Sequence, residues 1–359
     1  MPLVSDLEVR VSGPVARPVP SPPGVRYLVD SGPSERGTHR LMSFLHCPTL
    51  YAYLYELDLA ADGRRPLVLG SLTHTGLAHY YGRLGAAQQG GMVYIHTERQ
   101  LPGDPPVYSV PMRVTDPEVF YDPIESVYMA ADLRAQEGGV EGRLATVLKD
   151  QAAEMVRKVM DKEAKHGRPF RRVLGVEVPV ELRTGEHKIT TKLDLITEVI
   201  PVGSRTPKRR VVDHKTAARP GDQATLDKYV PTLQLAVMRV VGRKLFKDLY
   251  DGTYLHLVDS VGDTGGRMLQ PAPAPHIERK VLDLLLEVEQ NIARLKVERP
   301  DPWSWPMAAN EQSCTSPYGA KKRCEGWELC TAGPVEGEFR HTLRENRRAQ
   351  ETKLLESSD

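Results

Sequence analysis

KLDLI (192–196) and VVDHKTA (211–217) are the stretches that decide the fold, because each is an apolar, strand-like run that carries acidic side chains. Side chains two residues apart on a strand point to the same face. Asp213 and Lys215 therefore face one way, while His214 points the other way and leaves its backbone carbonyl between them. Upstream, RRVLGVEVPVEL (171–182) predicts another strand, with Gly-Glu at 185–186 in the hairpin turn before KLDLI.

These residue types suit metal-dependent cleavage of phosphodiester bonds. A divalent cation binds the scissile phosphate and lowers the pKa of the attacking water, and hard cations such as Mg²⁺ prefer oxygen ligands. Asp194, Asp213 and the carbonyl of His214 can supply those oxygens, and Lys215 can orient water and offset the charge on phosphate. The competing interpretation is a structural salt bridge between strand ends, which spacing alone leaves at even odds.

A histidine upstream is a further candidate. His74 lies in a helix predicted over 70–84, on the apolar face that also carries Leu77, Ala78 and Tyr81. Such a histidine is usually a hydrogen-bonded core residue. The functional alternative is a metal ligand or phosphate contact at the edge of a cleft.

The cysteines form a second pattern. Cys314, Cys324 and Cys330 are spaced C-x9-C-x5-C in a loop-rich segment, and the fourth cysteine, Cys47, lies far upstream. A segment with so little apolar periodicity needs another source of order, which a metal supplies. Four thiolates suit either Zn²⁺ or an iron–sulfur cluster, and the spacing does not choose between them. Four unrelated thiols are the third alternative.

Bulk properties set limits on these hypotheses. The chain has 359 residues, 40% of them hydrophobic, and a formal net charge of +1, which argues against a histone-like, wholly electrostatic nucleic-acid binder. No apolar run reaches the roughly 18 residues of a membrane span, and the N-terminus lacks the pattern of a secretory signal. We therefore expect a cytoplasmic protein, in a bacterial or phage-infected cell, whose thiols are reduced.

The order of predicted elements gives the architecture. A helix, three strands, a helix and a fourth strand favour an α/β fold with a mixed central sheet flanked by helices. The expected organisation is, in order, a proline-rich and mostly disordered arm, a nuclease-like domain with an insertion at 87–138, a cysteine segment that closes onto Cys47, and a charged tail; their ranges are 1–37, 38–300, 301–335 and 336–359.

Two basic segments are candidate phosphate contacts. Arg209 and Arg210 precede the Asp-His-Lys run, and Lys321 and Lys322 lie within the cysteine loop. A solvated loop is the usual explanation of such charge runs.

Taken in order, the motifs resemble the RecB-like nuclease family of PD-(D/E)XK type, which includes CRISPR-associated RecB-type exonucleases, the AddB nuclease module and phage exonucleases. SFLHCPTLYAY (43–53) resembles the opening helix with its cluster cysteine, LGSLTH (69–74) the histidine motif, and GVEVPVEL (175–182) with KLDLI the strands before the active site. VVDHKTA resembles the (D/E)XK strand, and Gln234 in TLQLAVM (232–238) the glutamine of a Q-x-x-x-Y helix, where Met238 replaces tyrosine.

The resemblance implies a restriction-endonuclease-like core, with a C-terminal segment ligated by Cys47, Cys314, Cys324 and Cys330 to a [4Fe-4S] cluster. It implies catalysis by Asp194, Asp213, Lys215 and Gln234, and binding of Mg²⁺ or Mn²⁺ by His74, Asp194, Asp213 and His214. The expected substrate is DNA, single-stranded or at duplex ends, cleaved by an exonuclease in recombination, repair or phage DNA metabolism, with recombination or CRISPR-type protein partners. The alternatives are an endonuclease on the same fold and a non-catalytic, zinc-containing DNA-binding subunit.

Overall fold

The computed structural model describes the chain in thirteen stretches, which are 8–11, 26, 28–29, 37–57, 59–60, 65–88, 93–95, 112–184, 187–222, 233–246, 249–269, 275–306 and 342–343. The chain divides into two compact units. The first comprises Met1–Gly37 and Arg64–Leu282, and the second comprises Thr38–Gly63 and Asp283–Asp359.

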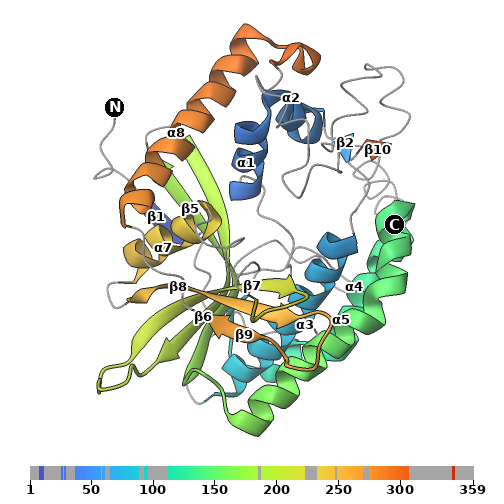
Figure 1. Ribbon diagram of the computed structural model, residues 1–359, viewed down its shortest axis with the longest axis vertical. Coiled ribbons are helices and arrows are strands. Elements are labelled where there is room, and N and C mark those ends of the chain that lie inside the picture. The colour runs from blue at the N-terminus through green and yellow to red at the C-terminus, as the bar shows by residue number, and fades with distance from the viewer. Residues whose placement is uncertain are drawn as a thin grey trace. The chain divides into compact units, whose positions relative to one another are not determined.

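The first unit is built on a mixed sheet of eight strands in the order β4-β3-β5-β6-β7-β8-β9, with β1 also pairing with β5 (Figure 1). The pairs β3–β5 and β7–β8 are parallel, and the remaining pairs are antiparallel. The strands are β1 Glu8–Val11, β3 Val93–Ile95, β4 Met112–Val114, β5 Arg172–Thr184, β6 His187–Val199, β7 Lys208–Ala217, β8 Leu249–Asp259 and β9 Arg267–Leu269.

Helices cover this sheet, which confirms the predicted α/β architecture. Figure 1 shows α3, α4 and α5 together on one side of the sheet and α7 on the other. The main core lies between the sheet and the α3–α5 group, where side chains such as Leu72, Leu148 and Val173 are fully buried. The bounds are α3 Arg65–Ala87, η3 Pro117–Val119, α4 Pro123–Glu137, α5 Gly139–His166 and α7 Leu233–Leu245.

The central strands β6 and β7 pair over only part of their length and then separate. Their pairing runs only between Val199↔Lys208 and Leu195↔Val212. Beyond that point β6 continues against β5, and β7 continues against β8. Asp194 and Asp213 lie immediately beyond the last pair, so the fork between the two strands is where the acidic side chains meet.

Part of the predicted insertion belongs to this sheet and its cover. Within 87–138, β3 and β4 extend the sheet and α4 packs against α3 and α5. The start of α4 carries a recognisable signal, since the Asp122 carboxylate accepts hydrogen bonds from the backbone amides of Ile124 (2.9 Å) and Glu125 (3.3 Å), and Pro123 takes the first helical position.

The second unit contains α1 Thr38–His46, α2 Pro48–Tyr51, the π-helix η2 Ala52–Glu56 and the 3₁₀ turn η4 Pro302–Ser304. Two short strands also pair there, β2 Leu59–Ala60 and β10 Thr342–Leu343. The long helix α8, Pro275–Glu298, begins in the first unit and ends in the second. Within the described ranges, no helix combines the length and apolar character that crossing a bilayer demands.

Aromatic packing joins the two halves of the second unit. The Tyr51 ring stacks on Trp305 with centroids 5.7 Å apart, and the Thr49 hydroxyl donates to the Trp305 carbonyl at 3.0 Å. Cys47 is buried at the junction of α1 and α2. Three of the predicted cluster cysteines, together with Lys321 and Lys322, lie outside the described residues; the cysteines are Cys314, Cys324 and Cys330.

Two glycines on α3 provide a test of this packing. A Cβ added at Gly76 would lie 2.6 Å from Val156 Cγ2 and 2.7 Å from Val127 Cγ2, whereas at Gly70 the nearest atom would be 3.6 Å away. We expect Gly76→Ala to lower the free energy of unfolding by about 1–3 kcal/mol through overpacking. Gly70→Ala should be neutral, or stabilising by up to about 1 kcal/mol through helix propensity. Urea unfolding measures both, and equal effects would contradict the packing described.

Candidate metal centre

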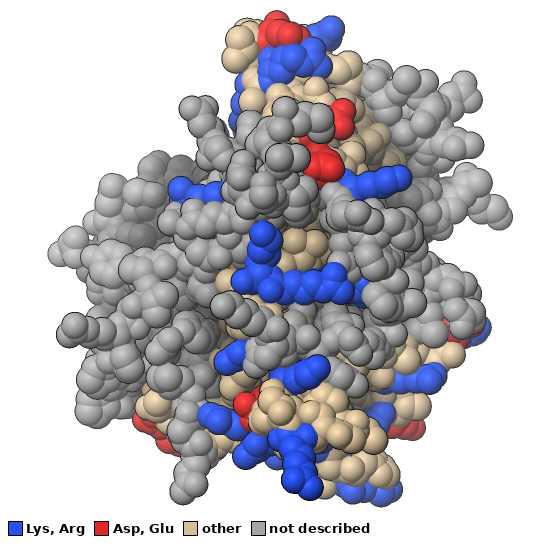
Figure 2. Space-filling model, turned by 90° about the vertical axis from the view of Figure 1, so that its left-hand side faces the viewer, with Lys and Arg blue, Asp and Glu red and all other residues tan. Residues whose placement is uncertain are grey.

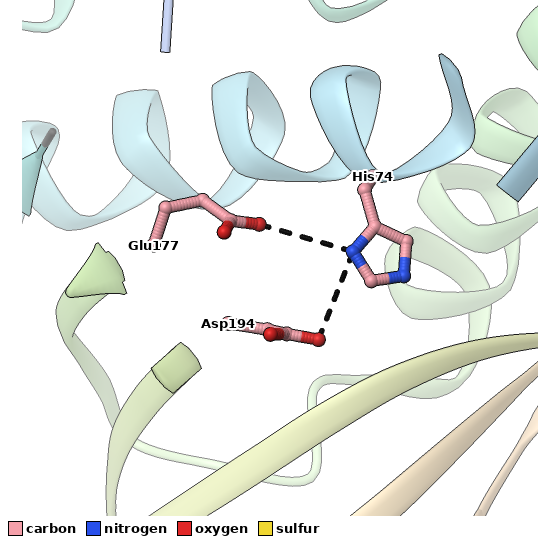
Figure 3. Close-up of side chains that lie close together, drawn as sticks. All are labelled: His74, Glu177 and Asp194. Carbon is pink, nitrogen blue, oxygen red and sulfur yellow. Dashed lines mark ion pairs between the residues drawn. The ribbon is translucent and has the colours of Figure 1, made fainter. Parts of the chain in front are cut away.

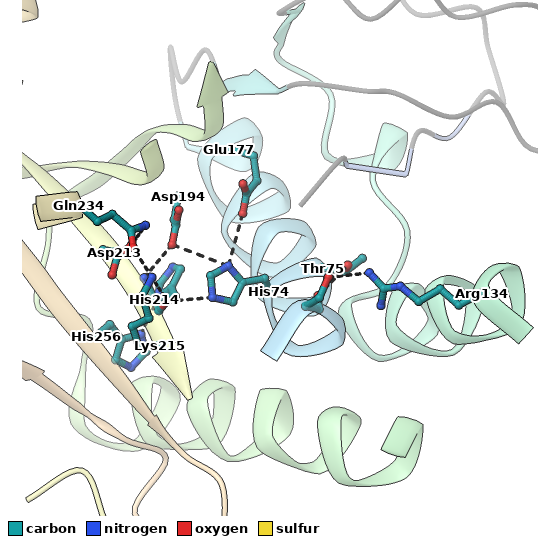
Figure 4. A network of polar contacts seen from close by, with 11 residues as sticks. His74, Thr75, Arg134, Glu177, Asp194, Asp213, His214, Lys215, Gln234 and His256 are labelled. Carbon is teal, nitrogen blue, oxygen red and sulfur yellow. Dashed lines mark hydrogen bonds and ion pairs between the residues drawn. The ribbon is translucent and has the colours of Figure 1, made fainter. Parts of the chain in front are cut away.

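The candidate site gathers side chains from five elements at the strand fork (Figure 4). Helix α3 supplies His74, β5 supplies Glu177 and β6 supplies Asp194. The rest come from β7 and α7, and they are Asp213, His214, Lys215 and Gln234. Every residue that the sequence analysis assigned to catalysis or to the divalent metal is therefore found in one place.

Three of these residues form a cluster of possible ligands (Figure 3). His74 Nδ1 lies 3.9 Å from Glu177 Oε1 and 3.7 Å from Asp194 Oδ2. One donor atom from each residue lies within 4.8 Å of the others. Around an octahedral ion with ligands at about 2.1 Å, neighbouring donors are about 3.0 Å apart and opposite donors about 4.2 Å. The cluster therefore fits a small divalent cation with little rearrangement.

Asp213 is held by two donors on one of its oxygens. Lys215 Nζ donates to Asp213 Oδ1 at 2.8 Å, and Gln234 Nε2 donates to the same oxygen at 3.0 Å. Neither of these bonds uses Oδ2. The pair therefore orients the carboxylate and leaves its second oxygen for another partner, such as a cation.

The peptide of His214 lies between the acidic residues and the histidine. Its amide donates to Asp194 Oδ2 at 2.8 Å. Its carbonyl oxygen lies 2.8 Å from His74 Nε2 and accepts a bond from Lys215 Nζ at 3.3 Å. The backbone of this one residue thus contacts three of the residues that form the site.

Burial governs the electrostatics of the site. Burial raises the pKa of Asp194 and of Asp213 above the ordinary value, although the positive charge of Lys215 opposes the rise. Burial lowers the pKa of His74, but the nearby carboxylates of Glu177 and Asp194 outweigh that effect, so the pKa is raised. Buried carboxylates so close together are short of positive charge, which a bound cation would supply.

Glu177 is the site residue that sequence analysis did not select as a ligand. Its neighbours pair as Val176↔Leu195 and Val178↔Leu193, which places Glu177 opposite Asp194. Its φ of 48° lies in the left-handed region, which is uncommon for a residue other than glycine and is often found at functional sites. The signal was present in the Val-Glu-Val alternation, but only the strand register pairs it with Asp194.

The two described basic candidates lie elsewhere, near the start of β7. Arg210 lies over the Tyr254 ring, 3.9 Å from its centroid, and donates to the Pro169 carbonyl at 3.1 Å. Arg209 lies over the Phe246 ring, 5.4 Å from its centroid. Their guanidinium groups are thus engaged within the protein, and neither belongs to the cluster at the fork.

Comparison with protein families decides what kind of core this is. A family model described as the PD-(D/E)XK nuclease superfamily matches residues 38–331, which is most of the chain. The chain belongs to the PD-(D/E)XK nuclease superfamily. Members of this superfamily are nucleases that hydrolyse phosphodiester bonds with the help of Mg²⁺ or Mn²⁺. The sequence of the site residues Asp213-His214-Lys215 has the order of acid, any residue and lysine that the name of the superfamily gives.

The remaining comparisons add little to the family assignment. Among solved structures, protein VC1899 from Vibrio cholerae is 14% identical, and the match covers 69% of this chain and 60% of that protein, with a TM-score of 0.19. This similarity is too weak to carry an argument. No curated protein matches the sequence.

The raised pKa values predict a trade-off between stability and metal binding. The folded, metal-free chain holds protons on Asp194 and Asp213 more tightly than the unfolded chain, so its stability falls as pH rises from about 4 through the raised pKa values. Asp194→Asn keeps an acceptor for the His214 amide and removes one charge. We expect it to stabilise the metal-free protein by roughly 0.5–2 kcal/mol at pH 7.

The measurement is unfolding with EDTA or Mn²⁺. The gain from Asp194→Asn should shrink toward pH 4, where the wild-type carboxyl is protonated. Mn²⁺ should stabilise the wild type and not the variant, because only the wild type binds it. If the variant is less stable than the wild type without metal, yet is stabilised by Mn²⁺ to the same extent, Asp194 is not a ligand of the metal.

Proposed function

We propose that this protein is a metal-dependent DNA exonuclease. The observation that carries the proposal is the convergence of His74, Asp194, Asp213 and Lys215 at the fork between β6 and β7. These residues come from three elements, α3, β6 and β7, and their convergence supports a metal-dependent nuclease site. A salt bridge between strand ends would need only Asp213 and Lys215, and does not explain the cluster around His74.

His74, Asp194, Asp213 and the carbonyl of His214 would hold Mg²⁺ or Mn²⁺, with Glu177 as a further ligand on the side of His74. A cation held there would supply polarisation of the scissile phosphate and a lower pKa for the attacking water. Oxygen donors dominate this set, as hard cations prefer. The donors are buried or half-buried, so little bulk water weakens their attraction for the ion.

Lys215 would position the nucleophilic water and stabilise the charge that develops on the phosphate. Its ammonium group is held by Asp213 and by the His214 carbonyl, so it points into the site and not to solvent. Gln234 would keep the Asp213 carboxylate oriented through Oδ1. The proposed metal ligands and the ammonium group of Lys215 thus lie next to each other at the strand fork.

The preference for DNA ends, single-stranded or duplex, follows from the resemblance to RecB-like enzymes, and so does a place in recombination, repair or phage DNA metabolism with recombination or CRISPR-type protein partners. Arg209, Arg210, Lys321 and Lys322 are proposed phosphate contacts. For Arg210 this requires release of the contacts to Tyr254 and Pro169.

We also propose a [4Fe-4S] cluster on Cys47, Cys314, Cys324 and Cys330. Cys47 is buried at the junction of α1 and α2. Tyr51 on α2 stacks on Trp305, and Trp305 lies shortly before Cys314 in the sequence. Arg40 on α1 and Glu289 on α8 form an ion pair at 3.0 Å, which joins these two helices within the second unit. The cluster would close a very long loop between the first cysteine and the last three.

Lys215→Ala tests the catalytic role. We expect at least a 100-fold loss of cleavage rate on end-labelled DNA, because removing one charge-stabilising donor typically costs that much. Mn²⁺ binding and the folded state should persist, since the ligands are unchanged. Lys149→Ala, on α5 and paired with Asp132 at 3.5 Å, is the matched control and should cleave normally.

Retained metal-dependent cleavage by Lys215→Ala would overturn the assignment of this lysine. Circular single-stranded DNA added as a second substrate separates the two nuclease types, because an exonuclease needs an end. Wild-type protein without cleavage under any metal condition would favour the DNA-binding subunit.

The cluster is tested by metal content. Protein purified without oxygen should be coloured and contain about four iron atoms per chain, as a [4Fe-4S] cluster on four thiolates requires. Cys324→Ala should lose colour and iron, and the free energy of unfolding should fall. Colourless protein with one zinc per chain would replace the cluster with a structural Zn²⁺ site.

A further inference from the structure

A pair of buried histidines lies directly behind the site. His256 on β8 is the register partner of His214 on β7 in the parallel β7–β8 pair. Their Nδ1 atoms are 3.0 Å apart, which is hydrogen-bond distance. Both side chains are buried, and His256 takes no part in the mechanism described above. Figure 4 shows His256 on the far side of His214 from Glu177.

Proton positions in this pair follow from the surroundings. Burial lowers the pKa of His214 well below its ordinary value and that of His256 to about 4, so both rings are neutral near pH 7. The backbone of Gly265 lies beside the His256 ring and raises the pKa of that ring, although burial outweighs this effect. A neutral imidazole carries one proton. One of the two facing Nδ1 atoms therefore carries its ring's proton and donates it to the other.

The His214 ring is fixed from more than one direction. The Tyr81 ring lies parallel to it, with centroids 5.5 Å apart and an interplanar angle of 2°. The Tyr81 hydroxyl donates to the buried carboxylate of Glu163 at 2.9 Å, which anchors the stacking partner. His74 approaches the same ring edge-on, with centroids 5.9 Å apart. Ring stacking restricts tilt, and the bond to His256 sets rotation within the plane.

Gly265 holds the other end of this chain of contacts. Its φ is +63°, and an added Cβ would lie 2.6 Å from the Lys158 carbonyl on α5. The turn it belongs to is tied to α5, since Lys158 Nζ donates to the Gly262 carbonyl at 3.0 Å. Gly265 is therefore part of a turn that is anchored to α5, and the chain of contacts runs from that turn through two imidazoles to the His214 backbone.

We propose that His256 is a positioning residue for the metal site, fixing the His214 ring and, through it, the carbonyl that lies between Asp213 and Lys215. This inference rests on the proposed metal-binding function. Two buried imidazoles cost more than apolar side chains of the same size unless they are hydrogen-bonded. A core without function here would be served by aliphatic residues, as at Val212 and Leu257 on the same strands.

The experiment compares two amides of different reach. In His256→Asn the amide lies near the place of Nδ1 and can still donate to His214 or accept from it, whereas in His256→Gln it lies near the place of Nε2, away from His214. The dissociation constant for Mn²⁺ is measured on the full chain by electron paramagnetic resonance of the free ion. Unfolding is followed on the same samples with EDTA.

His256→Gln should weaken Mn²⁺ binding about 10-fold or more, the usual effect of removing an outer-shell partner of a metal site. His256→Asn should stay within about 3-fold of the wild type. Val114→Ala is the control for general destabilisation, since Val114 is buried on the edge strand β4, which holds none of the site residues. It should lower the unfolding temperature and leave Mn²⁺ affinity unchanged.

The outcomes distinguish a failure of the proposed function from a failure of the role of His256 alone. If the wild type does not bind Mn²⁺, or Asp194→Asn binds it equally well, the proposed function fails. If those controls behave as expected but His256→Gln binds Mn²⁺ like the wild type, only the role of His256 fails. The same conclusion follows if the two amide variants weaken binding equally and in proportion to their loss of stability. If His256→Gln does not fold, His256→Asn decides, because a loss of 10-fold or more in that variant overturns the proposal.

Discussion

Burial of several carboxylates at one strand fork is the constraint on which the rest of this structure depends. Glu177 and Asp194 face each other across β5 and β6, and Asp213 follows where β7 leaves β6. Like charges directly opposite each other on a sheet are destabilising. A fold tolerates such an arrangement when something compensates for it, and the compensation available here is one lysine, one histidine and the space for a cation. The site therefore lowers the free energy of unfolding below the value that uncharged side chains would give, as is common at functional sites.

Supporting contacts explain how the fork keeps its shape despite that repulsion. The backbone amide of His214 donates a hydrogen bond to Asp194, and its backbone carbonyl contacts His74. His74 and Tyr81 are two helical turns apart on α3, so one face of that helix contacts both the acidic cluster and the His214 ring. The α3 backbone is brought close to its neighbours by glycine, since Gly76 leaves room for Val127 and Val156. Packing of α3 is thus coupled to the geometry of the ligands.

The central part of this arrangement could be predicted from the sequence, and the reasons are local. Strand alternation placed Asp213 and Lys215 on one face, and apolar periodicity placed His74 on the inner face of its helix. The fold class followed from the order of elements and is confirmed by the family match.

Glu177 was not selected as a ligand from the sequence, because its partner across the sheet depends on the strand register. His256 was equally hidden, since nothing in YLHLVDSV (254–261) shows that β8 would pair in parallel with β7 and place His256 opposite His214. The strands β3 and β4 and the helix α4 within the predicted insertion at 87–138 were not predicted, although Asp122 and Pro123 carry the signature of a helix start. Residue roles, domain limits and the cysteine cluster stay predictions.

The most direct test of the central claim is a cleavage assay on end-labelled single- and double-stranded DNA. Protein purified without oxygen would be assayed with Mg²⁺, Mn²⁺ or EDTA, beside Asp213→Ala. If the fork is a metal centre for phosphodiester hydrolysis, cleavage appears with either metal and disappears with EDTA and in the variant, and the product ladder gives the polarity. Cleavage that persists in Asp213→Ala, or in EDTA, would contradict the account.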